Sequence, residues 1–290
     1  MSTSYGGQAV IEGVMMKGPS RVGLAVRKPD GTIALEQEKV QGWSNRYRFM
    51  TWPLIRGTFV LIESLVLGMK MLNKSANLAM AEEDEELSGT EMAITGIVAF
   101  LVAMALFVAL PTVVVHYTRS FLGGVFLQNI VEGIIRITLL LAYIAVITRM
   151  DEIERVFMYH GAEHKVINAY EAGSEMTVEQ IRKYSTLHPR CGTAFLLIVM
   201  VVSIFVFAML GEGSIWWRVG SRIMCFPIVA GIGYEFIRFS GRYGNRPWAR
   251  WLIAPGLWMQ KLTTREPDDD QLAVALESLN LVLEDEPRAA

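Results

Sequence analysis

The sequence carries little charge, almost no cysteine and no basic excess. Charged residues make up 19% of its 290 residues, whereas soluble domains carry roughly 25%. The formal net charge of −2 argues against a nucleic-acid binder, and a chain this apolar is not disordered. Cys191 and Cys225 are its two cysteines, too few for a secreted disulfide scaffold. The low charge also disfavours an ordinary soluble enzyme.

An apolar leader is missing as well. The first basic residue is Lys17, and the opening stretch is rich in glycine rather than hydrophobic. A signal peptide has a basic start followed by an apolar core. We therefore expect insertion into a membrane to depend on internal segments.

Long uncharged segments are what the sequence does contain. Hydrophobic residues make up 52% of the chain, and its mean hydropathy is +0.34. Residues 93–115 contain no charge and are long enough to cross a hydrocarbon core roughly 30 Å thick. A second segment is uncharged, and two more carry few charges. The sequence predicts four transmembrane helices, within residues 93–115, 125–148, 193–210 and 216–236.

The distribution of basic residues predicts the orientation of these helices. Ten Lys or Arg residues precede the first helix, six lie in residues 149–192, and six follow Phe239. Residues 116–124 hold one, and residues 211–215 hold none. Basic loops stay in the cytoplasm. We therefore expect a multi-pass membrane protein with both termini in the cytoplasm.

Five charged residues fall inside two of the predicted helices: Glu132, Arg136, Arg218 and Arg222, and Glu235 near the end of the last helix. An unpaired charge at this depth is costly. We therefore expect Glu132 to pair with Arg222, Arg218 or Arg136. A structural ion pair and a proton or ion path would use the same residues, and the sequence leaves both open.

The remaining segments predict a small cytoplasmic α+β part. Residues 21–36 are typical of a β-hairpin, because Lys28-Pro29-Asp30-Gly31 supplies the turn. Residues 54–72 suit an interfacial or re-entrant helix, and an acidic linker follows at 82–86. An amphipathic helix is expected from Asp268 or Asp269 to about Leu283, packed within the chain.

The fold class is therefore mainly α and integral to the membrane, with four transmembrane helices. Its cytoplasmic part comprises an N-terminal β-hairpin, a histidine-bearing helix and the C-terminal amphipathic helix. The predicted divisions are a Gly-rich β segment (1–53), an interfacial helix with its acidic linker (54–92), a first transmembrane hairpin (93–148), a cytoplasmic loop with the metal motifs (149–192), a second transmembrane hairpin (193–239) and a cytoplasmic tail (240–290).

Three of the four histidines lie within residues 160–188. His160 and His164 are one helical turn apart, so two imidazole nitrogens can converge on one ion. Between them stands Glu163, in the His-x-x-Glu-His order of the inverted zincins, placed to act as general base. Glu171 returns to the same helix face as a further ligand or as a residue that orients one. A helix over 151–171, stopped by Gly173, is expected to carry them.

A second histidine motif directly precedes the third predicted transmembrane helix. His188 and Cys191 are three residues apart, and an imidazole with a thiolate is a good zinc pair. With His160 and His164 they would complete a closed tetrahedral set. If Cys191 stays free, an open position remains for water, as catalysis requires. A hydrogen-bonded polar cluster and a Cys191 nucleophile with His188 as its base are the other readings.

Three motifs together resemble the bacterial YqhQ-like family of membrane proteins: residues 5–16 (YGGQAVIEGVMM), 159–165 (YHGAEHK) and 188–193 (HPRCGT). The resemblance extends over nearly the whole chain. It implies a metal-dependent enzyme of the bacterial inner (cytoplasmic) membrane, and it directs attention to Glu12 in the first motif. Glu12 is either a solvent-facing strand residue or a ligand, base or substrate contact beside the histidines.

The function expected from these residues is that of a membrane hydrolase using Zn²⁺ or another divalent transition metal. Glu163 and Glu12 would be its catalytic carboxylates, and its substrate would be membrane-associated. One alternative is a non-catalytic, zinc-stapled scaffold or assembly factor for another membrane or secretion component. A second is a metal-ion carrier or sensor. The expected partners are membrane lipid and, under the scaffold alternative, another membrane protein. The sequence is compatible with a homo-oligomer, and no nucleic-acid partner is expected.

Overall fold

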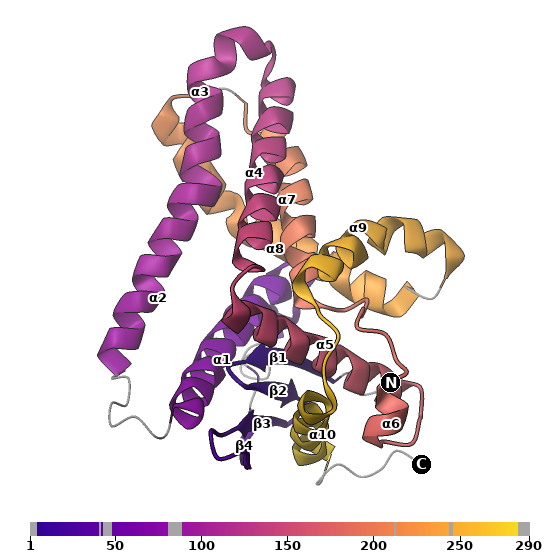
Figure 1. Cartoon of the computed structure of the whole chain (residues 1–290). Coiled ribbons are helices and arrows are strands. Elements are labelled where there is room, and N and C mark those ends of the chain that lie inside the picture. Colours follow the sequence, from indigo (N-terminus) through magenta and orange to yellow (C-terminus); the bar gives the residue numbers. More distant parts are fainter. Residues whose placement is uncertain are drawn as a thin grey trace.

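The computed structural model describes residues 5–40, 42, 48–80, 89–211, 213–243 and 246–283. The acidic linker predicted at 82–86 lies outside these residues. Within them the chain is mainly helical, with one small antiparallel sheet near its N-terminus. Figure 1 shows the long apolar helices forming one half of the molecule and the sheet lying in the other half.

The sheet is a four-stranded meander in the order β1-β2-β3-β4. The predicted hairpin is confirmed, with Gly31 at positive φ in its turn. The Gly-rich residues before it add two further strands, which the sequence analysis did not resolve. The bounds of the strands are Gly6–Val10 (β1), Gly13–Lys17 (β2), Arg21–Arg27 (β3) and Ile33–Lys39 (β4).

Helices cover both faces of this sheet, because its strands alternate apolar side chains between them. On one face Met15 and Leu24 pack with Met71 of α1 (Ile55–Ala79). On the other face Met16 packs with Tyr159 of α5 and with apolar residues of α10. The bounds of these two helices are Asp151–Glu171 (α5) and Asp269–Leu283 (α10).

Helix α10 is the predicted C-terminal amphipathic helix, and it does pack within the chain. Asp268 Oδ1 accepts a hydrogen bond from the main-chain N–H of Gln271 at 2.8 Å and so caps the helix. Ser278 Oγ donates to the carbonyl of Gly23 in β3 at 3.0 Å. The last described residues of the chain therefore complete the layer that covers its first strands.

Within the described residues, three helices are long and apolar enough to cross a membrane, which makes this a membrane protein: Ile94–Leu122, Val125–Ile147 and Ile215–Tyr243. The first comprises α2 (Gly89–Met104), the π-helical turn η3 (Ala105–Ala109) and α3 (Leu110–Leu122), and the others are α4 and α8.

The prediction of four transmembrane helices is met only in part. The third predicted span is α7 (Gly192–Ala208), which is apolar but has 17 residues. At 1.5 Å per residue it is about 25 Å long, short of a hydrocarbon core of roughly 30 Å. It is short because Cys191 caps its N-terminus and Gly211, at positive φ, follows its C-terminal end.

Both helical hairpins begin and end at the side of the molecule where the sheet lies (Figure 1). Helix α5 follows α4 and lies between the apolar helices and the sheet. After a short α6 (Val178–Ile181) the chain enters α7, and after α8 it continues into α9 (Pro247–Thr263). The helix predicted at 54–72 is one continuous helix, α1, which joins α8 to the sheet.

The junction of α1 with α8 is close and charged. A side chain at Gly57 would lie 2.9 Å from the Cα of Gly231, so the two helices meet through glycine. Arg56 forms two hydrogen bonds with the carboxylate of Glu235, at 2.7 and 2.5 Å. This contact fixes the sheet relative to the apolar helices.

The predicted pairing of Glu132 is confirmed. Its carboxylate accepts hydrogen bonds from Arg222 at 2.7 and 2.6 Å and from Arg136 at 2.9 Å. The Nε of Arg136 donates to the carbonyl of Phe107 at 2.8 Å. That carbonyl lies four residues before Pro111, which has no N–H to give it. Arg218, the third predicted partner, donates instead to the side chain of Gln128.

Replacing Glu132 with Gln should destabilise the protein by on the order of 3–5 kcal/mol, because two buried guanidinium groups lose their counter-charge. The measurement is unfolding by sodium dodecyl sulfate titration of the detergent-purified protein. Glu36→Gln is the control, since Glu36 forms a partly exposed pair with Lys74 at the surface that is worth about 1 kcal/mol. Equal losses for the two variants would contradict the prediction.

Candidate metal centre

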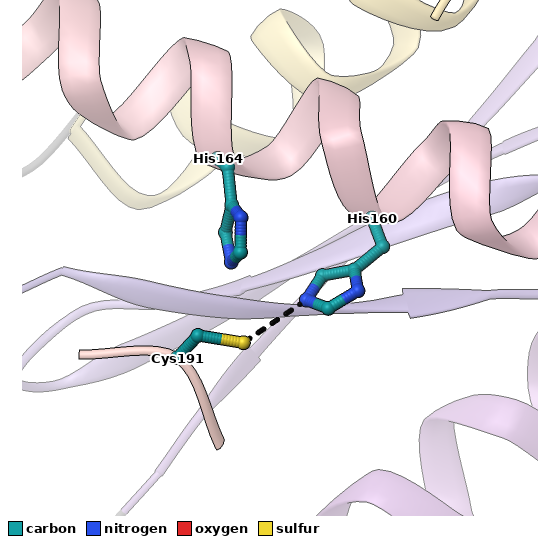
Figure 2. A group of neighbouring side chains, drawn as sticks. All are labelled: His160, His164 and Cys191. Carbon is teal, nitrogen blue, oxygen red and sulfur yellow. Dashed lines mark hydrogen bonds between the residues drawn. The ribbon is translucent and has the colours of Figure 1, made fainter. Parts of the chain in front are cut away.

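Helix α5 presents His160 and His164 on one face, as the spacing predicts. Its first turn carries acidic residues, which suit the positive end of a helix dipole. It ends before Gly173, whose φ of +66° lets the chain turn away. Figure 2 shows both imidazole rings projecting from the same side of the helix.

Cys191 reaches the two histidines from a separate segment, the loop before α7 (Figure 2). One ligand atom from each of His160, His164 and Cys191 lies within 4.8 Å of the others. Sγ of Cys191 is 3.2 Å from Nε2 of His160, and the two ring centroids are 4.4 Å apart. Among the described residues, this trio is the group of histidine, cysteine or acidic side chains that is arranged to hold an ion.

Main-chain carbonyls fix the protonation of both rings. Nδ1 of His160 lies 2.8 Å from the carbonyl of Thr263, and Nδ1 of His164 lies 2.5 Å from that of Thr186. A carbonyl only accepts, so Nδ1 carries the proton in each ring. In the neutral rings the Nε2 atoms therefore present lone pairs. Metal-binding histidines are oriented in the same way, and nitrogen and sulfur donors suit Zn²⁺.

Glu163 borders this group. Its Oε2 lies 3.5 Å from Nε2 of His164, and its side chain is buried. A lone pair facing a carboxylate is repulsive unless a positive charge, either a ring proton or a metal ion, balances it. The space for this side chain exists because residue 7 is glycine, where a Cβ would lie 2.7 Å from Cγ of Glu163. A glycine of the motif at residues 5–16 thus makes room for the glutamate of the motif at residues 159–165.

The loop that carries Cys191 has little regular structure, and α5 holds it through carbonyl groups. Besides His164, Lys165 donates to the carbonyl of Arg182 at 2.7 Å. Asn168 donates to those of Ser185 and Leu187, at 2.8 and 3.1 Å. One polar face of α5 therefore supplies both the candidate ligands and the donors that position the loop.

Gln260 of α9 completes the support of this loop. Its side chain accepts from the N–H of His188 and donates to the carbonyl of the same residue, each at 2.9 Å. Gln260 is fully buried. The sequence analysis missed this residue, since a single glutamine far from the motifs gives no local signal.

His188 does not join the three-residue group. Its Nε2 lies 3.6 Å from Oε2 of Glu171, while Arg190 pairs with the other oxygen of that carboxylate. Burial alone would raise the pKa of Glu171, but hydrogen bonds from His188 and Arg190 outweigh it and lower this pKa. Two of the predicted ligands are thus paired with each other. The nitrogen facing Cys191 belongs to His160, not to His188, the base predicted for a cysteine nucleophile.

Glu12 lies in the turn between β1 and β2, at a φ of +50°. Its carboxylate accepts from Arg155 of α5 at 2.6 and 2.5 Å, and the Tyr159 hydroxyl donates to it at 3.4 Å. Burial and this carboxylate raise the pKa of Tyr159, and the pair with Glu12 raises that of Arg155. Glu12 is outside the three-residue group and fixes the sheet to the first half of α5.

Gly161, between the two histidines, stands where the structure leaves no room for a side chain. A Cβ at Gly161 would collide with the carbonyl of Arg265, whose N–H donates to the carbonyl of Phe157 at 2.9 Å. The segment after α9 therefore lies directly on α5. This close approach brings the Thr263 carbonyl to His160.

A model of the family described as "Protein of unknown function (DUF1385)" matches residues 52–285. The chain belongs to this family. A similar protein is "Uncharacterized protein YqhQ" of Bacillus subtilis (strain 168). It is 36% identical over 293 residues, which cover 97% of this chain and 92% of that protein. No solved structure matches. The predicted family is therefore correct, while neither description mentions a metal or an activity.

In this DUF1385 chain, Gly161→Ala should destabilise the protein by on the order of 1–3 kcal/mol, because the new methyl group forces the Arg265 carbonyl away from α5. Gly220→Ala in α8 is the matched control, since a Cβ there meets nothing within 4 Å. Denaturant unfolding of both variants checks this. Equal stabilities would show that the segment after α9 is not packed on α5.

Proposed function

We propose that this protein is a metal-dependent hydrolase at a membrane face, with Zn²⁺ or a similar divalent transition metal held by His160, His164 and Cys191. One observation carries the proposal. Two imidazoles are locked by carbonyls so that their Nε2 lone pairs point toward one buried sulfur. A bound ion would balance the contact between the Nε2 lone pair of His164 and the carboxylate of Glu163, which a cluster without a metal balances only with an added proton.

Three protein ligands favour catalysis over a closed structural site. A tetrahedral zinc with three protein ligands keeps one position open. When bound, such an ion polarises a carbonyl or phosphoryl oxygen and makes a water molecule more acidic. The engagement of His188 by Glu171 supports this count, because His188 is the residue that would otherwise close the set.

Glu163 supplies the proton transfers in this proposal. Its carboxylate borders the ligand atoms, is buried, and rests against Gly7 of β1. It would accept a proton from the attacking water and return it to the leaving group, as a general base and then acid. Thr263 and Thr186 hold the ring protons through their carbonyls and keep both imidazoles oriented.

The position of the site favours a membrane-associated substrate. Cys191 directly precedes the apolar helix α7, and α5 directly follows the span α4. The excess of basic residues on this side of the helices predicts that it faces the cytoplasm of a bacterial inner membrane. A substrate that reaches the trio would therefore be presented near the cytoplasmic surface of the bilayer.

A structural staple is the second candidate, and the same trio motivates it. A metal on these ligands would join α5 to the first residue before α7, as a fold-stabilising zinc does. The protein would then act as a scaffold for another membrane component, and Glu163 would be dispensable. An ion carrier is less well supported, because Arg136 and Arg222 surround Glu132 with excess positive charge.

The purified protein should hold about one zinc per chain, because three converging donors form one site. Elemental analysis should show that His164→Ala and Cys191→Ser each lose this metal. His188→Ala and His116→Ala should keep it, because His188 pairs with Glu171 and His116 is not one of the three converging residues. Absence of metal from the wild-type protein supplied with zinc would refute the proposal.

Substitution with Co²⁺ separates the hydrolase from the staple. An open coordination position should accept acetohydroxamate, which would change the visible spectrum of the Co²⁺ protein. The Glu163→Gln variant should keep the metal and the hydroxamate response while losing hydrolysis, because its amide accepts no proton. A spectrum that hydroxamate leaves unchanged would favour the closed structural site.

A further inference from the structure

An apolar cavity of about 260 Å³ lies between α7, α8 and α9. It exists because α8 and α9 each pack on α7 but make few contacts with each other. Its walls include Ile198 of α7, Phe236 and Ile237 of α8, and Leu257 of α9. Apolar cavities of roughly 150 Å³ already hold a molecule as large as benzene. The space between these helices is therefore large enough for a segment of a hydrocarbon chain.

The lining of this cavity offers a ligand no unengaged polar side chain. Among the described residues, none of those that line it is charged, and its polar side chains are those of Ser240 and Gln260. Ser240 Oγ donates to the carbonyl of Pro189 at 2.9 Å. The amide of Gln260 is engaged by both main-chain groups of His188. A charged or hydrogen-bonding ligand would lose its water partners here without replacement, so the cavity suits a hydrocarbon.

The cavity opens to the surface between α7 and α9. Val201 of α7 and Leu252 of α9 both line it, and they are 41% and 52% exposed. Val201 lies near the middle of α7, an uncharged helix that packs on the spans α4 and α8. The surface of such a helix in a membrane meets acyl chains rather than water. The mouth of the cavity therefore faces the lipid.

Tryptophan side chains project from the outer face of α9. Trp248, Trp251 and Trp258 are 54%, 85% and 67% exposed, and helical spacing puts them on one side of α9. Tryptophan is enriched where a membrane meets water, and an amphipathic helix lies there with its apolar face at the boundary between headgroups and acyl chains. Figure 1 shows α9 projecting sideways from the end of the apolar helices that is nearer the sheet. Leu252 is exposed near these tryptophans and also lines the cavity, so its mouth opens where the acyl chains begin.

We propose that this cavity binds one acyl chain of a membrane phospholipid, with the headgroup outside it beside α9. A phospholipid supplies an uncharged chain at the depth of the mouth. A free fatty acid would bring a carboxylate, for which the described lining holds no cation. A helix of another protein, roughly 10 Å across with its side chains, is too bulky for a cavity of this volume.

The cavity is separate from the candidate metal centre. None of His160, His164 and Cys191 lines it. Binding of an acyl chain therefore requires neither the metal nor hydrolysis, and it can be tested without either.

The first test counts phospholipid on the full-length protein. The protein is reconstituted in vesicles of equal parts phosphatidylcholine and phosphatidylglycerol, extracted, washed in lipid-free detergent and weighed by native mass spectrometry. The wild-type protein should retain about one phospholipid per chain, because a pocket of this size takes one chain. The mass distinguishes a phospholipid from a free fatty acid or a detergent molecule, and retention of either of these in its place would overturn the proposal.

Ile198→Trp should lower the retained phospholipid about tenfold or more, because the indole fills the cavity and each methylene that it displaces is worth about fourfold in affinity. Leu196→Trp is the matched control on the same helix, since Leu196 is 45% exposed and does not line the cavity. It should retain phospholipid as the wild-type protein does. Equal retention by the two variants would contradict the proposal.

A photoreactive lipid locates the bound chain in the unaltered protein, so that the result does not depend on how a variant folds. The vesicles then contain a phosphatidylcholine with a diazirine in the middle of one acyl chain. Irradiation follows the detergent wash, so that only retained lipid reacts. Crosslinks should lie within residues 194–202 of α7 and 252–257 of α9, which line the cavity. Crosslinks confined to other helices, or no retained lipid to crosslink, would refute the assignment.

Discussion

The need to satisfy the carbonyls of residues 182–188 determines how the half of the structure that contains the sheet is arranged. A buried main-chain carbonyl without a donor costs free energy comparable to a lost hydrogen bond. This loop has little regular structure to supply donors, and the polar face of α5 supplies them through His164, Lys165 and Asn168. The opposite, apolar side of α5 covers the sheet. One helix thus fixes the position of Cys191 relative to the histidines.

In the apolar half, buried charged groups likewise need partners. Glu132 accepts hydrogen bonds from two guanidinium groups, and one of them, that of Arg136, also donates to the carbonyl of Phe107. Where helices approach closely, as α1 and α8 do at Gly57, absence of a side chain permits the contact. Polar networks therefore stabilise both halves of the structure, and glycine allows helices such as α1 and α8 to pack closely.

Local pattern predicted much of this structure. The hairpin at 21–36, the helix with its two histidines, the C-terminal helix and the partners of Glu132 all follow from spacing and charge. The span predicted at 193–210 corresponds to α7 (Gly192–Ala208), which ends two residues earlier, because hydropathy does not show where the chain leaves the helix before Gly211. The pairing of His188 with Glu171 and the clamp of Gln260 depend on contacts between distant segments, which no local pattern encodes.

Helix α10 packs on β3, although more than two hundred residues separate them. A ribosome makes the strands before the apolar helices and α10 after them. One face of the nascent sheet therefore stays exposed while the apolar helices enter the bilayer. The carbonyl of Thr263, which orients His160, is also synthesised late. A chain terminated after α8 would therefore have one face of its sheet uncovered and His160 without the carbonyl that orients it.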